Sequence, residues 1–225
     1  MNAEELERPV LAVDVVLFAV YEKKLRVLLR TRQKEPFRDA PALPGVAVRV
    51  DETLETAARR AIEKKTQWKG KDLFLEQLAA FDGLYRDPRG RTISLAFMGI
   101  VRTMPEEKQG IIWKDCREVT ENSLPFDHGL IVRTAVQRLG GKLRYTNIAK
   151  EFLPDTFRIE ELQNIYEIIM QCSLNRSNFR NKLLKIGMIE QVTVLTEAVG
   201  KKGGRPPHLY RFAQDRIEMT ERDFL

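Results

Sequence analysis

The sequence predicts an α/β protein of the α+β kind, with a mixed-sheet domain over residues 1–148 and a smaller helical domain over residues 149–225. Three observations lead to this prediction. Runs of β-branched and leucine-rich residues recur through the first half, which is typical of strands. In the second half apolar residues recur at helical spacing, and a basic loop rich in glycine and proline follows them. The segment YTNIAKEF separates the two patterns.

The first domain begins with two apolar runs, VLAVDVVLFAV and LRVLLRTR, joined by the polar segment YEKK. Two strand-forming runs with a short polar turn between them predict a β-hairpin. The runs LEQLAAFDGL and TISLAFMGIV predict two more strands, linked by YRDPRGR, which contains Pro88 and Gly90. A further short strand is predicted in GIIWKDC. We expect these strands to form one mixed sheet.

Two helices accompany the predicted sheet. The segment ETAARRAIEKK contains alanine and long unbranched side chains without glycine or proline, which favours a helix. The second helix is predicted in PFDHGLIVRTAVQRLGG, where Asp127 can cap the start and Val132, Val136 and Leu139 lie on one stripe. Gly140 is expected to end this helix.

The second domain begins with a predicted helix in FRIEELQNIYEIIM. Its apolar residues Ile159, Leu162, Tyr166 and Ile169 have helical spacing. After this helix the chain predicts two strands, in MIEQVTVLTEAV and HLYRF, on either side of the basic loop GKKGGRPP.

Another helix is predicted between these elements, in NRSNFRNKLLKIG. Asn175 can cap it, Phe179, Leu183 and Ile186 are expected to form its buried stripe, and Gly187 to stop it.

Composition excludes several classes of protein. The 225 residues are 43% hydrophobic and 31% charged, which suits a protein with a sizeable core rather than a disordered chain. The start lacks the basic region of a signal peptide, and Asp14 interrupts the longest apolar run, so we expect no membrane segment. The two cysteines, Cys116 and Cys172, lack metal-ligand spacing. These features predict a cytoplasmic protein with reduced thiols and no metal site.

Positive charge is concentrated near the C-terminal end. Between residues 175 and 216 the chain has nine Lys or Arg residues against three Asp or Glu residues, although the whole chain has a net charge of only +6. A local basic zone of this kind indicates an anionic partner such as nucleic acid. A solvated basic face is the alternative interpretation.

The run from Gly45 to Trp68 resembles the Nudix box. In that family a helix of the form Arg-Glu-apolar-x-Glu-Glu places carboxylates toward one pocket, where they bind Mg²⁺ and activate water to cleave a pyrophosphate. Glu52 holds the early acid position here and Arg60 the helix arginine. The remaining acid positions fall on Ala61, Lys64 and Lys65. Ammonium groups cannot replace oxygen ligands of a divalent cation, so the resemblance implies a Nudix fold without catalytic residues.

A second motif narrows the resemblance. The turn YRDPRGR between two strands is similar to a loop in Nudix proteins that act on ADP-ribose and related nucleotides. Its arginines can offer guanidinium groups to phosphates, although a solvated turn would have the same composition. The predicted effector-binding residues are Gly45, Arg49, Glu52, Arg60, Arg86, Arg89 and Arg91.

The second domain has the pattern of a winged helix-turn-helix, with two short helices followed by a β-hairpin. The helix NRSNFRNKLLKIG would be the recognition helix, because its polar side carries residue types that hydrogen-bond phosphates and base edges. The basic loop would be the wing tip. The predicted DNA-binding residues are Arg176, Ser177, Asn178, Asn181, Lys182, Lys185, Lys201, Lys202 and Arg205. A winged helix used for protein contact is the alternative.

A Nudix domain followed by a winged helix resembles the Nudix-related transcriptional regulators of NAD metabolism. The resemblance implies a repressor that binds a palindromic double-stranded operator as a homodimer. It also implies release by ADP-ribose or a related NAD-derived nucleotide, with no cofactor required. Two other hypotheses remain: a pyrophosphatase that uses Glu52, Glu63 and ligands outside the box, and a nucleotide-binding adaptor without a role on DNA.

Overall fold

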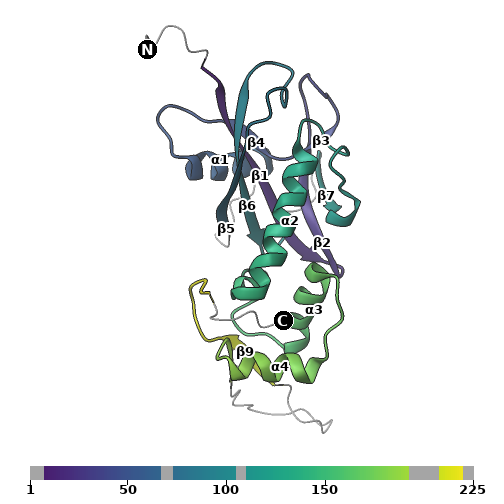
Figure 1. The fold of residues 1–225 in the computed structure, drawn as a ribbon, viewed down its shortest axis with the longest axis vertical. Coiled ribbons are helices and arrows are strands. Elements are labelled where there is room, and N and C mark those ends of the chain that lie inside the picture. Colours follow the sequence, from purple (N-terminus) through teal and green to yellow (C-terminus); the bar gives the residue numbers. More distant parts are fainter. Residues whose placement is uncertain (1–7, 67–72, 105–109, 193–207, 220–225) are drawn as a thin grey trace. The chain divides into compact units, whose positions relative to one another are not determined.

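A computed structural model gives the fold of the chain and describes residues 8–66, 73–104, 110–192 and 208–219. The chain forms two compact units, Met1–Gln137 and Arg138–Leu225 (Figure 1). The division falls within helix α2 (His128–Tyr145), so it does not coincide with the domain boundary predicted after residue 148. That boundary stays a prediction.

The first unit is built on a β-hairpin. Strands β1 (Val10–Tyr21) and β2 (Lys24–Thr31) pair antiparallel, with Tyr21 opposite Lys24. Glu22 and Lys23 form the two-residue connection with φ values of 48° and 56°. Positive φ at both central residues matches the right-handed twist of the flanking strands. The predicted hairpin is therefore confirmed.

One seven-stranded mixed sheet contains this hairpin, in the order β3-β2-β1-β6-β5, with β4 also paired to β1 and β7 to β2. Strands β1 and β6 are parallel, and the other pairs are antiparallel. A parallel pair beside antiparallel pairs makes the sheet mixed, as the sequence predicted. The remaining strands are β3 (Pro41–Ala42), β4 (Gly45–Ala47), β5 (Leu73–Phe81), β6 (Thr92–Val101) and β7 (Ile111–Asp115).

Helix α1 (Leu54–Thr66) packs against β1 of this sheet. Its small residues Ala57, Ala58 and Ala61 are fully buried and lie in one apolar cluster with Val13 and Val15 of β1. Because side chains alternate along a strand, Asp14 points to the opposite face. The start of α2 lies near that face, since the His128 ring is within 3.6 Å of Asp14.

Helix α2 is longer than predicted. It continues through Gly140 to Tyr145, so the expected end at Gly140 was wrong. Leu139 and Leu143 lie one helical turn apart on either side of Gly140 and are both fully buried. Burial of such leucines contributes more than the roughly 1 kcal/mol that a glycine costs inside a helix, so packing overrides the local preference.

The second unit contains helices α3 (Ile159–Met170) and α4 (Arg176–Lys185) and the antiparallel strands β8 (Ile189–Val192) and β9 (Leu209–Phe212). The predicted stripe of α3 is buried, at Ile159, Leu162, Tyr166 and Ile169. The edge-to-face ring contact between Tyr166 and Phe179 joins α3 to α4, with the ring centroids 5.0 Å apart.

The stripe predicted for α4 is partly wrong. Phe179 and Leu183 are buried, but Ile186 is 42% exposed. Helix α4 ends at Lys185, and Ile186 has left helical geometry with φ −84° and ψ 0°, so helical spacing no longer controls its direction. Gly187 follows with φ 69°, which a glycine adopts without strain, and this confirms the predicted helix stop. No helix among the described residues is long and apolar enough to cross a membrane.

Candidate functional sites

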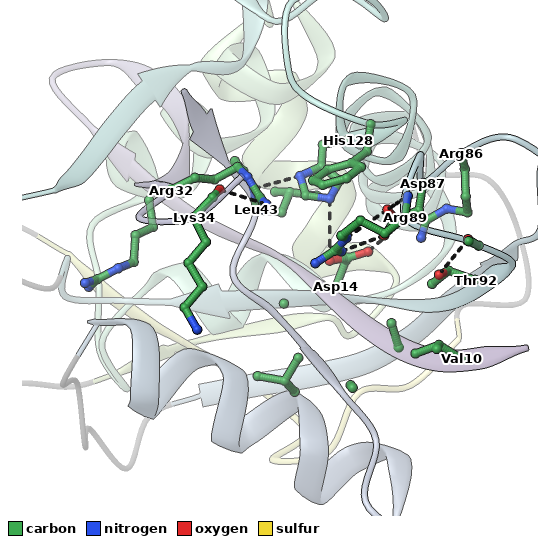
Figure 2. Close-up of a pocket in the computed structure, with 18 of the residues that line it drawn as sticks. Val10, Asp14, Arg32, Lys34, Leu43, Arg86, Asp87, Arg89, Thr92 and His128 are labelled. Atoms are coloured by element: carbon green, nitrogen blue, oxygen red, sulfur yellow. Dashed lines mark hydrogen bonds and ion pairs between the residues drawn. The ribbon is translucent and has the colours of Figure 1, made fainter. Parts of the chain in front are cut away.

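A cavity of about 860 Å³ lies in the first unit, lined by Asp14 of β1 and also by Lys64 of α1 (Figure 2). Among the described residues that line it, eight are basic and two, Asp14 and Asp87, are acidic. Its volume lies within the range of small-molecule sites, and its charge suits an anionic ligand. The basic residues that line it are Arg8, Arg30, Arg32, Lys34, Lys64, Arg86, Arg89 and Arg91.

Asp14 is the centre of a buried polar network in this cavity. Its carboxylate accepts hydrogen bonds from the Ser94 hydroxyl at 2.7 Å and from Nη2 of Arg86 at 3.2 Å. A Cβ atom at Gly45 would lie 2.1 Å from Oδ1 of Asp14, so only glycine fits there without movement. Gly45 therefore lets β4 approach the carboxylate closely.

Arg86 is held by two carboxylates rather than presented to the cavity. Asp127 accepts hydrogen bonds from its Nε and Nη2 at 2.8 and 2.6 Å, and Asp14 accepts the third. The Arg86 side chain is only 5% exposed. This arginine is consequently part of the wall, and its guanidinium fixes the start of α2 to the loop before β6.

His128 extends the network. Its Nδ1 accepts a hydrogen bond from the backbone N–H of Leu43 at 3.0 Å, so the neutral ring carries its proton on Nε2, toward Asp14. Burial lowers the pKa of His128, which keeps the ring neutral at physiological pH. His128 had not been singled out from the sequence, although it lies in the segment PFDHG beside the predicted cap.

Two further guanidinium groups gather at Phe126. Arg32 lies 4.7 Å and Arg89 5.6 Å from the centre of the Phe126 ring. Arg89 also pairs with Asp87 at 2.6 Å. Figure 2 shows Arg32 on one side of Asp14 and Arg89 on the other. Burial and then the charge of Arg89 lower the pKa of Arg32, so an anion between these arginines would relieve their repulsion.

The predicted effector-binding residues separate into two groups. Gly45, Arg86, Arg89 and Arg91 line the cavity. Arg49, Glu52 and Arg60 are not among its lining residues. Arg32, Lys34 and Phe126 do line it and were missed. Arg32 and Lys34 could have been found from the basic run RTRQK at the end of a predicted strand.

Glu52 and Arg60 instead hold the loop before α1. Nε of Arg60 donates to Glu52 at 2.8 Å, a second bond runs from Nη2 to the same carboxylate, and Nη2 also donates to the Ala47 carbonyl at 2.9 Å. The Arg49 backbone N–H donates to Glu52 at 2.8 Å. The Arg60 hydrogen bond above all lowers the pKa of Glu52 to about 2. Glu52 is thus engaged in a structural ion pair.

The residues at the remaining box positions do not fit a divalent cation. Ala61 is fully buried in the apolar cluster, and Lys64 brings an ammonium group to the cavity. Lys65 lies at the end of α1, and the structure does not describe its side chain. Glu63 is exposed and does not line the cavity. Among the described residues no group of three or more His, Cys, Asp or Glu side chains is placed to hold a metal ion.

Helix α4 of the second unit offers a polar surface. Asn175 caps it by accepting the Asn178 backbone N–H at 3.0 Å. Arg176 is tied to α3 through Glu160 at 2.9 Å and Gln163 at 3.2 Å. The other predicted contact residues of this helix are exposed, namely Ser177, Asn178, Asn181, Lys182 and Lys185. Lys201, Lys202 and Arg205 lie outside the described residues.

Comparison with known proteins agrees with both units. A family model for the NUDIX domain matches residues 10–130, and one for the NrtR DNA-binding winged helix domain matches residues 149–212. The ADPR responsive transcriptional repressor NtrR of Acinetobacter baylyi is 33% identical over 213 residues, which cover 91% of this chain and 82% of that protein. The chain belongs to the NrtR family. The predicted fold class and family are therefore confirmed.

Two solved structures of the NrtR family resemble the chain. Shewanella oneidensis NrtR aligns with a TM-score of 0.77 and 25% identity over 95% of this chain and 99% of that one. Its NUDIX domain in complex with ADP ribose aligns with a TM-score of 0.55 and 27% identity over 62% and 94%. An ADP-ribose pyrophosphatase of Methanocaldococcus jannaschii is also 36% identical over 132 residues, or 56% of this chain and 72% of that enzyme.

Proposed function

We propose that this NrtR-family protein is a DNA-binding transcriptional repressor that ADP-ribose, bound in the Nudix cavity, releases from its operator. One observation carries the proposal. A basic cavity of nucleotide size lies on a Nudix fold whose box positions do not fit a catalytic metal, and the same chain carries a winged helix. The relative from Acinetobacter baylyi, described as an ADPR-responsive repressor, supports the same combination.

Arg32 and Arg89 are the arginines that suit the diphosphate of the ligand. They lie near one ring, and Arg32 keeps Nη1 available because its Nε and Nη2 donate to the Pro36 and Lys34 carbonyls. Planar guanidinium groups bind phosphate oxygens in pairs. Arg86 then acts indirectly, because it positions Asp14 and the start of α2. Arg91, whose Nη1 donates to the Asp82 carbonyl at 2.7 Å, keeps its other nitrogens for the ligand.

The cavity is proposed to sense its ligand without cleaving it. Cleavage of a pyrophosphate by Nudix enzymes needs carboxylates around Mg²⁺, and here Glu52 is paired with Arg60 while Lys64 lines the cavity. The competing function is a pyrophosphatase with non-standard ligands, which the Methanocaldococcus jannaschii relative favours. Release of AMP from ADP-ribose in the presence of Mg²⁺ or Mn²⁺, at about 1 s⁻¹ or faster, would establish that alternative.

On the DNA side, α4 is proposed to enter the major groove with Asn178, Asn181 and Lys182 toward base edges. The wing residues Lys201, Lys202 and Arg205 are proposed to contact phosphates or the minor groove. A homodimer would place two such helices on a palindromic operator. The repressor would act in the cytoplasm on genes of NAD synthesis and salvage, as the resemblance implies.

ADP-ribose must act through a difference between its affinities for two arrangements of the protein. ADP-ribose weakens DNA binding only if it binds the DNA-competent arrangement less well than another arrangement. A hundredfold loss of operator affinity corresponds to about 2.7 kcal/mol of coupling.

A titration of the protein–DNA complex tests the proposal. The full chain selects a duplex from a random-sequence pool, and fluorescence anisotropy then follows that duplex while ADP-ribose, NAD or ATP is added. We expect ADP-ribose to release the duplex at concentrations where ATP does not. Retention of the duplex with every nucleotide would contradict the effector role, and failure to enrich any duplex would contradict the DNA-binding role.

A further inference from the structure

Helix α1 carries a cation into the cavity at a position where a Nudix enzyme has a metal-binding carboxylate. Lys64 lines the cavity together with Gly45, Val46 and Ala47 of β4. One turn earlier, Ala61 packs against the sheet and fixes the orientation of this face of the helix. The core therefore fixes the helix position from which Lys64 lines the cavity.

The ammonium group of Lys64 is available for a ligand. Among the described residues it has neither a carboxylate partner nor a hydrogen bond, whereas Arg59 on the same helix is paired with Glu55 at 2.9 Å. A lysine without a partner that faces a cavity lowers its energy by binding an anion. Basic residues outnumber acidic ones among the described lining residues, so the lining does not neutralise the charge of Lys64.

A diphosphate needs positive charge close to its bridging region. Nudix enzymes supply that charge with a divalent cation held by carboxylates, as the box resemblance implies. Here the two glutamates that the box segment offers as ligands, Glu52 and Glu63, are not placed to hold one. Glu52 is bonded to Arg60, and Glu63 does not line the cavity. An ammonium group is a compact point charge that contacts phosphate oxygens directly.

We propose that Lys64 takes the place of the divalent cation at the diphosphate of the ligand, so that this chain binds ADP-ribose without metal. The proposal rests on the effector function above and adds how the charge of the ligand is neutralised. The same lysine that removes the catalytic metal site provides the substitute charge. Sensing therefore does not depend on the cellular concentration of free Mg²⁺.

Calorimetry with the full chain and ADP-ribose tests this proposal. The unaltered protein is titrated in EDTA and again in excess Mg²⁺, and we expect equal affinities. Lys64→Met should weaken binding in EDTA roughly 10- to 100-fold, because one charge-assisted contact is lost. Arg59→Met is the matched control, since it removes one positive charge from the same helix at a residue outside the cavity lining. It should bind like the unaltered protein.

Lys64→Glu reverses the charge at this position of the cavity. It restores a carboxylate at the cavity, and Mg²⁺ is commonly bound by one or two carboxylates together with substrate phosphates. We expect this variant to bind ADP-ribose weakly in EDTA and more tightly in Mg²⁺. Glutamate suits an exposed helix position, and a thermal unfolding curve checks that the variant is folded.

The outcomes separate this proposal from the function on which it rests. If the unaltered protein binds ADP-ribose only in Mg²⁺, or if Lys64→Met binds like Arg59→Met, the substitution of metal by Lys64 is wrong while the effector role stands. The same holds if Mg²⁺ does not improve binding by Lys64→Glu. If the unaltered protein does not bind ADP-ribose in either buffer, both the effector role and this proposal are wrong.

Discussion

Replacement of Arg86 by methionine tests the buried charge network beneath the cavity. The guanidinium of Arg86 lies 2.6 Å from Asp127 and 3.2 Å from Asp14, and its side chain is 5% exposed. Methionine has a similar length but leaves both carboxylates without their cation. Removing one partner of a buried ion pair costs about 3–5 kcal/mol. We expect about 3 kcal/mol, because Asp127 is partly exposed and Asp14 retains its hydrogen bond from Ser94.

Urea titration followed by tryptophan fluorescence measures this loss in the first unit alone, since both tryptophans, Trp68 and Trp113, belong to it. Arg89→Met is the control. The Arg89 side chain is 60% exposed and pairs with Asp87, and exposed ion pairs contribute only about 0–1 kcal/mol. If Arg86→Met lowers the free energy of unfolding no more than Arg89→Met does, the network does not stabilise the unit and the argument fails.

Four further single substitutions have expected outcomes. Asp115→Asn should lower the free energy of unfolding by about 1–2 kcal/mol at neutral pH in urea titrations. The Arg117 hydrogen bond lowers the pKa of Asp115 to about 2, so this difference should shrink below about pH 4 and vanish near the folded pKa. Gly45→Ala would place a methyl group 2.1 Å from a carboxylate oxygen and should cost about 1–3 kcal/mol in the same assay, with weaker ADP-ribose binding by calorimetry. In anisotropy titrations, Asn181→Ala should reduce the binding free energy by about 1–3 kcal/mol on the selected duplex and by less on random DNA. Lys201→Ala should weaken binding to both kinds of DNA and make the slope of log affinity against log salt concentration shallower by about one unit.

Most of the secondary structure followed from local patterns. The β1–β2 hairpin, strands β5 and β6 and the stripe of α3 were predicted correctly because periodicity and turn residues act over short distances. The errors occurred where packing overrides local preference. Gly140 lies inside a helix that buried leucines extend, and Ile186 turns outward because its helix ends one residue earlier.

The cavity was harder to predict, because its residues come from distant parts of the chain. The turn YRDPRGR offered three arginines that the sequence could not distinguish. The fold distinguishes them, since Arg86 meets Asp14 and Asp127 from positions 72 and 41 residues away, while Arg89 pairs within its own turn. Phe126, which gathers Arg32 and Arg89, gave no signal in the sequence, because an isolated phenylalanine is most often a core residue.

The pattern of matches to the Nudix box has a physical explanation. The matching residues Glu52 and Arg60 bond to each other. Arg60 also donates to the Ala47 carbonyl of β4, and Glu52 accepts from the Arg49 N–H, so both shape the loop whether or not a reaction takes place. The box position at Ala61 packs in the core, and the one at Lys64 faces the cavity, so neither residue is needed for that loop. On the proposed function, a change from carboxylate to ammonium at the cavity would remove catalysis and keep affinity for a diphosphate. A protein that destroys its ligand reports flux, whereas one that only binds it reports concentration, which is the quantity that a repressor must sense.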